Sequence, residues 1–128
     1  MPSYIFFFVA LGFLLTHEMD AVRRHEWQVF PLLSRLRDDE RGYTLFTALH
    51  VPLYVLLLWG IFTNGTTINR FFVTGLDIFC IVHVLLHLLL IKHPRYQFNN
   101  WFSWTLIVGA GIAGGIDLLF RAATTATG

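Results

Sequence analysis

Charged residues are scarce in this sequence, and their scarcity excludes most soluble folds. Only 13% of the residues are charged, whereas 55% are hydrophobic. A soluble domain of this length needs a more polar surface to stay in solution. The sequence also has no basic tract and no aromatic-basic groove, so it gives no reason to expect nucleic-acid binding.

Cysteine is represented by a single residue, Cys80, within an apolar run. An intrachain disulfide is therefore impossible, and the cysteine content indicates no redox compartment. Cys80 has no polar neighbours in the sequence that would activate it, and no serine has an obvious histidine and aspartate set. The sequence thus presents no catalytic nucleophile.

Basic residues are missing from positions 1–16, which argues against a secretory signal. Such a signal begins with a positively charged region and ends at a small-residue cleavage site. Here the apolar run ends instead in Thr16, His17 and Glu18. We expect this segment to be a retained helix.

Long apolar stretches are abundant, at about 3–16, 44–62, 71–91 and 101–120. The last three suit a hydrocarbon core of about 30 Å at about 1.5 Å per residue. The first must continue to about residue 22 to cross, which brings His17, Glu18 and Asp20 to the apolar boundary, where such residues are usually paired or functional. The sequence therefore predicts one all-α domain over 1–128, an integral membrane bundle of four transmembrane helices at about 3–22, 44–62, 71–92 and 101–120.

The distribution of Lys and Arg predicts the orientation. Basic residues follow the first helix and the third helix: Arg23, Arg24, Arg35, Arg37, Arg41, Lys92 and Arg95. The opposite side has only Arg70 and Arg121. By the positive-inside rule, both termini lie on the non-cytoplasmic side.

Histidines concentrate in the half of the bundle predicted to be cytoplasmic. They are His17, His25, His50, His83, His87 and His93. His83 and His87 are four residues apart, so both imidazoles project from one helix face, as in helical metal sites. His50 precedes Pro52, which opens the helix backbone beside it.

Counted at about 1.5 Å per residue, His50 lies about 9 Å, His87 about 7 Å and His83 about 13 Å inside the predicted helix ends. These depths and spacings predict a shared divalent-metal site. Its expected ligands are His17, Glu18, His50, His83 and His87, a nitrogen and oxygen set that suits zinc or iron. If the protein is an enzyme, metal chemistry on a lipid-borne substrate would use Asp20 or Glu26 as the general base. Histidines that merely hydrogen-bond between helices are the plain alternative. A b-type haem held by two histidines is a further alternative, which the nearby acids disfavour.

The other half of the bundle carries two acids and a small-residue face. Asp117 can pair with Arg121 four residues later, and we expect Asp77 to pair with Thr74 or Arg70. Gly111 and Gly115 form a GxxxG pattern, which suits either close packing within the chain or a homodimer seam. This face and the many phenylalanines also suit an accessory subunit of a larger membrane complex. That role is the competing hypothesis, from a different functional class than metal binding.

Several motifs resemble those of small bacterial membrane families of unknown function. They are Thr16–Trp27, then Leu49-His50-Val51-Pro52, His93-Pro94 and Asn99-Asn100-Trp101. A neighbouring group is named for a His-x-x-Glu-Glu motif, which His17, followed by Asp20 and Ala21, meets only in part. The resemblance covers nearly the whole chain and implies a four-helix architecture in a bacterial inner membrane. It implies no reaction, so the metal hypothesis rests on the residues.

Overall fold

The computed structural model describes residues 4–36, 38–63, 65 and 67–126. Within these residues the chain forms four α-helices, α1 (Ile5–Arg23), α2 (Asp39–Phe62), α3 (Arg70–Leu90) and α4 (Trp101–Ala126). Two short 3-10 helices, η1 (Glu26–Gln28) and η2 (Leu33–Arg35), lie between α1 and α2. All four α-helices are long and apolar enough to cross a membrane, which confirms the predicted all-helical class.

Capping explains where two of the helices begin. The Asp38 side chain accepts hydrogen bonds from the amides of Glu40 and Arg41, so α2 starts at Asp39 rather than at 44. Asn69 caps α3 in the same way. At the other boundaries, α4 continues to residue 126 rather than stopping at 120, and the expected start of the first helix at residue 3 lies outside the described residues.

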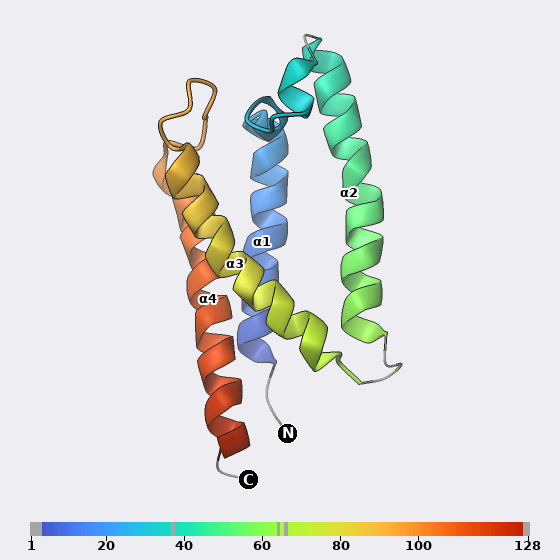
Figure 1. Ribbon diagram of the computed structural model, residues 1–128, viewed down its shortest axis with the longest axis vertical. Coiled ribbons are helices and arrows are strands. Elements are labelled where there is room, and N and C mark those ends of the chain that lie inside the picture. Colours follow the sequence, from blue (N-terminus) through green and yellow to red (C-terminus); the bar gives the residue numbers. More distant parts are fainter. Residues whose placement is uncertain (1–3, 37, 64, 66, 127–128) are drawn as a thin grey trace.

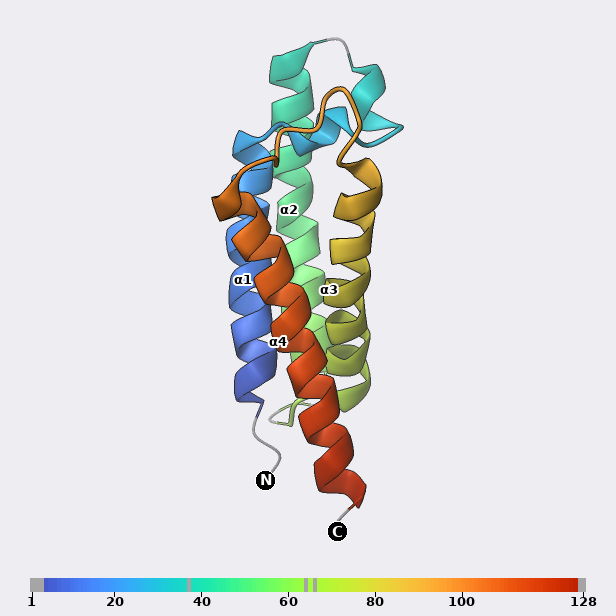
Figure 2. The ribbon, with the colours of Figure 1, turned by 90° about the vertical axis from the view of Figure 1, so that its left-hand side faces the viewer.

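The helices are arranged as a compact trio with one helix at its side (Figures 1 and 2). α4 packs against both α1 and α3, whereas α2 stands apart over most of its length (Figure 1). The start of α1 and the end of α4 lie at the same end of the bundle, which we call the terminal end. The segments that join α1 to α2 and α3 to α4 lie at the other end, which we call the loop end.

Glycines bring α4 close to α3. A Cβ atom at Gly114 would lie 3.1 Å from the main-chain oxygen of Asp77, and one at Gly111 would lie 2.6 Å from Cγ2 of Val84. Gly111 is buried in this contact and is therefore occupied within the chain. The small-residue face thus serves internal packing, and the alternative of a homodimer seam through Gly111 and Gly115 finds no support.

α2 is attached mainly near its ends. At the start of the helix a Cβ atom at Gly42 would lie 2.5 Å from the Trp27 indole nitrogen, and near its end Gly60 packs closely on the Phe72 ring. Between these contacts Val51 and Val55 are more than half exposed. The middle of α2 therefore offers apolar surface to its surroundings.

Polarity is distributed in the sense expected for a protein in lipid. Large apolar side chains such as Phe71 and Leu89 are 93% and 80% exposed, while His17 and Asp117 are completely buried. Water would favour the reverse distribution, whereas lipid favours apolar side chains outside and ionisable ones inside. The environment that fits this fold is a lipid bilayer.

Candidate metal centre

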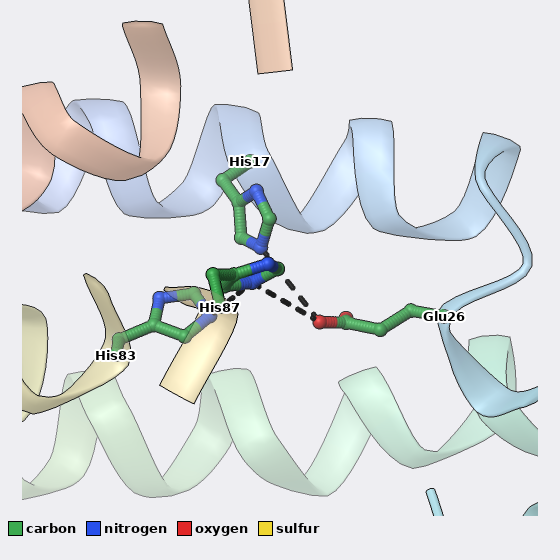
Figure 3. A group of neighbouring side chains, drawn as sticks. All are labelled: His17, Glu26, His83 and His87. Carbon is green, nitrogen blue, oxygen red and sulfur yellow. Dashed lines mark hydrogen bonds and ion pairs between the residues drawn. The ribbon is translucent and has the colours of Figure 1, made fainter. Parts of the chain in front are cut away.

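A cluster of metal-ligating side chains lies inside the bundle near the loop end (Figure 3). His17 comes from α1, His83 and His87 from α3, and Glu26 from η1. One ligand atom from each lies within 4.8 Å of the others, and all four residues are buried. We call this group the His/Glu cluster.

The distances within the His/Glu cluster approach those of a metal coordination shell. Nε2 of His87 lies 3.0 Å from Nε2 of His83 and 3.6 Å from Oε1 of Glu26, and Nε2 of His17 lies 3.9 Å from the same oxygen. Ligand atoms about 2.1 Å from a tetrahedral ion are about 3.4 Å apart. The measured separations scatter around this value, so the side chains converge on one point.

Unsatisfied nitrogens accompany this convergence. Neither ring nitrogen of His17 has a hydrogen-bond partner among the described residues, and Nδ1 of His83 also lacks one. A buried polar atom without a partner costs about 1–3 kcal/mol, more than most single contacts return. His17 is completely buried, so neither lipid nor bulk water can supply a hydrogen-bond partner for its ring. A bound ion would satisfy its Nε2.

His87 is held in place through its other nitrogen. The Tyr96 hydroxyl lies 2.9 Å from Nδ1 of His87, and both residues are buried. Burial raises the pKa of Tyr96, and the nearby Glu26 carboxylate raises it further, so the hydroxyl keeps its proton. If Nε2 of His87 held a metal, Nδ1 would carry the ring proton and donate a hydrogen bond to the Tyr96 oxygen. Such outer hydrogen bonds orient histidine ligands and strengthen their binding.

Aromatic rings surround the His/Glu cluster. The fully buried Phe98 ring packs 5.4 Å from the His17 ring and 5.0 Å from that of His87. The Phe79 ring stacks on His83 at 5.4 Å. The site is therefore dry, and a dry site strengthens the interaction of an ion with its ligands.

The turn after α1 explains how Glu26 reaches the histidines. His25 adopts the left-handed conformation, with φ 55°, immediately after the helix. A left-handed residue at this place ends a helix by reversing the chain direction. Glu26 then points back into the bundle instead of continuing along the axis of α1 (Figure 3).

Comparison with known proteins assigns the chain to a family. A profile described as "Family of unknown function (DUF6713)" matches residues 3–124. The chain belongs to this family. The assignment confirms the resemblance to an uncharacterised membrane family, and its description names no activity. Neither the curated proteins nor the solved structures include a match to this chain.

Two of the expected metal ligands face each other outside the His/Glu cluster. Oε2 of Glu18 lies 3.0 Å from Nε2 of His50, while Nδ1 of His50 lies 2.8 Å from the carbonyl oxygen of Phe46. That carbonyl can only accept, so Nδ1 of His50 carries a proton. The close contact at Nε2 then requires one further proton, on either His50 or Glu18. This proton satisfies the hydrogen bonding of both side chains. Of the five expected ligands, the structure brings only His17, His83 and His87 into the His/Glu cluster.

The two residues expected as general bases have different positions. Glu26 belongs to the His/Glu cluster. Asp20 instead accepts a very short hydrogen bond from the Ser103 hydroxyl and forms an ion pair with Arg24 at 3.3 Å. Ser103 lies in the first turn of α4, where it also exchanges hydrogen bonds with Asn100. Asp20 therefore connects the end of α1 to the start of α4. These contacts hold the Asp20 carboxylate outside the His/Glu cluster.

Tyr96 and Phe98 are contributors that the sequence did not reveal. Both lie in the irregular segment between α3 and α4, where no helical periodicity relates them to His87. His93 also attracts notice in the sequence, but it lies outside the His/Glu cluster, and its ring accepts a hydrogen bond from the amide of Arg95. A histidine count alone therefore does not separate the site from its surroundings.

Proposed function

We propose that this protein binds a divalent metal ion, zinc or iron, within the membrane bundle near its loop end. The ligands are His17, His83, His87 and Glu26. Imidazole nitrogens with one carboxylate oxygen match the preferences of both metals. The His/Glu cluster contains no thiolate, because Cys80 packs instead against Leu14 and Ala110.

The observation that carries this proposal is the fully buried His17 without a hydrogen-bond partner, beside three further ligands. A cluster held by hydrogen bonds alone would have to supply each ring with a donor and an acceptor. The Glu18–His50 pair meets that requirement through its neighbours, whereas His17 does not. A metal ion supplies what the His/Glu cluster lacks.

The completeness of the ligand set favours binding of the ion over catalysis by it. Catalytic zinc sites keep one coordination position open for water or substrate, and structural sites fill all four. Four donors converge here, so water could reach the ion only if Glu26 moved away. Chemistry on a lipid-borne substrate would therefore need Glu26 as a base instead of a ligand. Replacing Glu26 by Gln separates the two roles, because a ligand role predicts loss of metal and a base role predicts its retention.

We place the loop end on the cytoplasmic side of a bacterial inner membrane. The basic residues of the described segments that join α1 to α2 and α3 to α4 lie at this end, among them Arg35 and Arg95. Arg37 lies outside the described residues. Since α1 begins and α4 ends at the terminal end, the positive-inside rule puts these helix ends, and with them both termini, on the opposite side. Cysteine labelling from either side of the membrane, with residues introduced near Ser34 and near Thr125, tests this orientation.

Elemental analysis of detergent-purified protein tests the proposal. We expect near-stoichiometric zinc or iron in the wild type and its loss in the double variant His83→Ala/His87→Ala. His93→Ala is the matched control, because His93 lies outside the His/Glu cluster and is only partly buried. Metal-free wild-type protein, even after growth and purification with added zinc and iron, would refute the proposal.

Haem fits the geometry of this site less well than a single metal ion does. Axial ligation requires two imidazoles to face each other across a porphyrin. The nitrogens of His83 and His87 are instead 3.0 Å apart, and Phe98 fills the space beside His17 and His87. An absorption spectrum with a Soret band would overturn this preference.

A role as an accessory subunit of a membrane complex is the second candidate. The exposed apolar middle of α2, including Val51 and Val55, favours it. Purification in mild detergent separates this candidate from the first. Migration with a large complex, with the fold retained after chelation, would favour the subunit role, whereas a metal-bound protein migrating alone would favour the metal role.

A further inference from the structure

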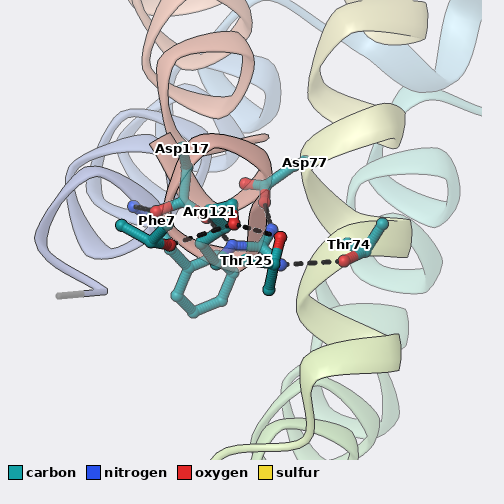
Figure 4. Close-up of polar contacts among 7 residues, drawn as sticks. Phe7, Thr74, Asp77, Asp117, Arg121 and Thr125 are labelled. Carbon is teal, nitrogen blue, oxygen red and sulfur yellow. Dashed lines mark hydrogen bonds and ion pairs between the residues drawn. The ribbon is translucent and has the colours of Figure 1, made fainter. Parts of the chain in front are cut away.

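A second polar cluster lies near the terminal end, away from the His/Glu cluster (Figure 4). Nε of Arg121 donates to Oδ2 of Asp117 at 2.5 Å, and Nη2 donates to Oδ2 of Asp77 at 2.5 Å. Thr74 accepts a third bond from Nη1. The expected Asp117–Arg121 pair is thus present, but Asp77 also pairs with Arg121 rather than with Thr74 or Arg70. The sequence could not show that one arginine serves both acids.

Formal charge does not balance in this cluster if both acids are ionised. Two carboxylates and one guanidinium carry a net charge of −1, and the described residues add no other cation to their polar contacts. Asp77 and Asp117 are almost completely buried, and Arg121 is nearly so. An unbalanced charge at this depth costs several kcal/mol. A further positive charge would remove that cost.

Hydrogen bonding indicates where this charge lies. Asp117 accepts from Arg121 and, through Oδ1, from the main-chain amide of Phe7 at 3.0 Å. Among the described residues, Asp77 accepts a side-chain bond from Arg121 through Oδ2, and its buried Oδ1 has no hydrogen-bond partner. Asp117 is thus engaged through both oxygens as an ionised carboxylate, whereas Asp77 has the free oxygen that can carry a proton.

We propose that Asp77 and Asp117 form a proton-binding site that holds one proton on Asp77. With the proton on Oδ1 of Asp77, Asp117 remains ionised and bound to Arg121 and to the Phe7 amide. The cluster then has no net charge. The proton also links the three helices of the trio, because α1 contributes the Phe7 amide, α3 contributes Asp77 and α4 contributes the ion pair.

Groups facing this site support the assignment to a proton. The titratable neighbours of Asp77 are Asp117 and Arg121 from α4 and Cys80 from its own helix, and α1 adds only a main-chain amide. An alkali cation would need several oxygen ligands. Around Asp77 the carboxyl oxygens are already engaged by Arg121 and Phe7, apart from Oδ1.

Infrared difference spectroscopy of the detergent-purified protein at neutral pH tests this site. We expect the carbonyl stretch of a protonated carboxyl group in the wild type and its loss in Asp77→Asn. Asp117→Asn should lose the same band, because Arg121 then balances Asp77 without a proton. Glu40→Gln is the control, since Glu40 is exposed and its replacement should leave the band unchanged.

Stability measurements add a second readout. Asn at position 77 mimics the protonated acid, so Asp77→Asn should melt within a few degrees of the wild type. Subtracting the Asp77→Asn spectrum from the wild-type spectrum cancels any band from Glu18, whose pair with His50 also holds a proton. Absence of the carboxyl band from this difference would overturn the proposal, as would a wild-type protein without any such band. Melting that rises with sodium chloride but not with choline chloride, and only when Asp77 is present, would replace the proton by an alkali ion. None of these readouts depends on the metal.

Discussion

Replacing Tyr96 by Phe is the sharpest single test of the candidate metal centre. The change removes only the hydroxyl that lies 2.9 Å from Nδ1 of His87, in a region where both residues are buried. With metal on Nε2, the Nδ1 proton of His87 would then have no acceptor. Such a loss costs about 1–3 kcal/mol. Since about 1.4 kcal/mol is a factor of ten, metal affinity should fall about 10- to 100-fold, the range found for lost outer hydrogen bonds.

Competition with a chelator measures this difference directly. Detergent-purified protein is loaded with zinc, titrated with a chelator of known affinity, and compared with Tyr43→Phe. Tyr43 is 43% exposed, so the control removes a tyrosine hydroxyl without touching the His/Glu cluster. Helix content of the metal-free proteins establishes that both variants fold. If Tyr96→Phe folds and binds zinc as tightly as the wild type, Tyr96 does not support a ligand and the assignment of His87 fails.

Further outcomes follow from the structure. Gly114→Ala should lower the melting temperature, because its Cβ atom would lie 3.1 Å from the backbone of Asp77 and such overpacking costs about 1–3 kcal/mol. Gly12→Ala has open space and should raise the melting temperature slightly, so equal effects of the two would contradict the α3–α4 contact. His50→Ala should keep its metal by elemental analysis, and metal loss would return His50 to the ligand set. Ser103→Ala should cost about 1–3 kcal/mol in thermal unfolding without changing metal content, because it leaves the buried Asp20 short of a donor, and an unchanged melting temperature would contradict that role. Acidification should release bound metal, because protons compete with the ion for the imidazoles, and dialysis at stepped pH followed by elemental analysis would show no release if histidines are not the ligands.

The sequence predicted the helices because their signal is local. Long apolar runs are sufficient for membrane-crossing helices, and the i, i+4 spacing of His83 and His87 places both rings on one face. The depth of His17 followed from the same count along α1. Each of these inferences needs only the rise and the period of a helix.

The partners of these side chains were not predictable in the same way. Glu18 and Glu26 are the same residue type and both lie close to the end of α1, yet only Glu26 joins the histidines. The left-handed conformation of His25 decides this, and nothing in the residue type demands it. His50 was expected to join the ligand set on grounds of depth, but α2 stands to one side of the trio and His50 pairs with Glu18.

The sequence by itself determined an all-helical membrane protein with its ionisable residues inside, because hydropathy and helical period act on each segment alone. The tertiary structure decided which of those residues meet. It joined three histidines to Glu26, paired Glu18 with His50, and placed Asp77 and Asp117 on one arginine. These choices depend on how α1, α3 and α4 cross and on one turn after α1. Such long-range contacts arise from packing between segments, and no single segment encodes them.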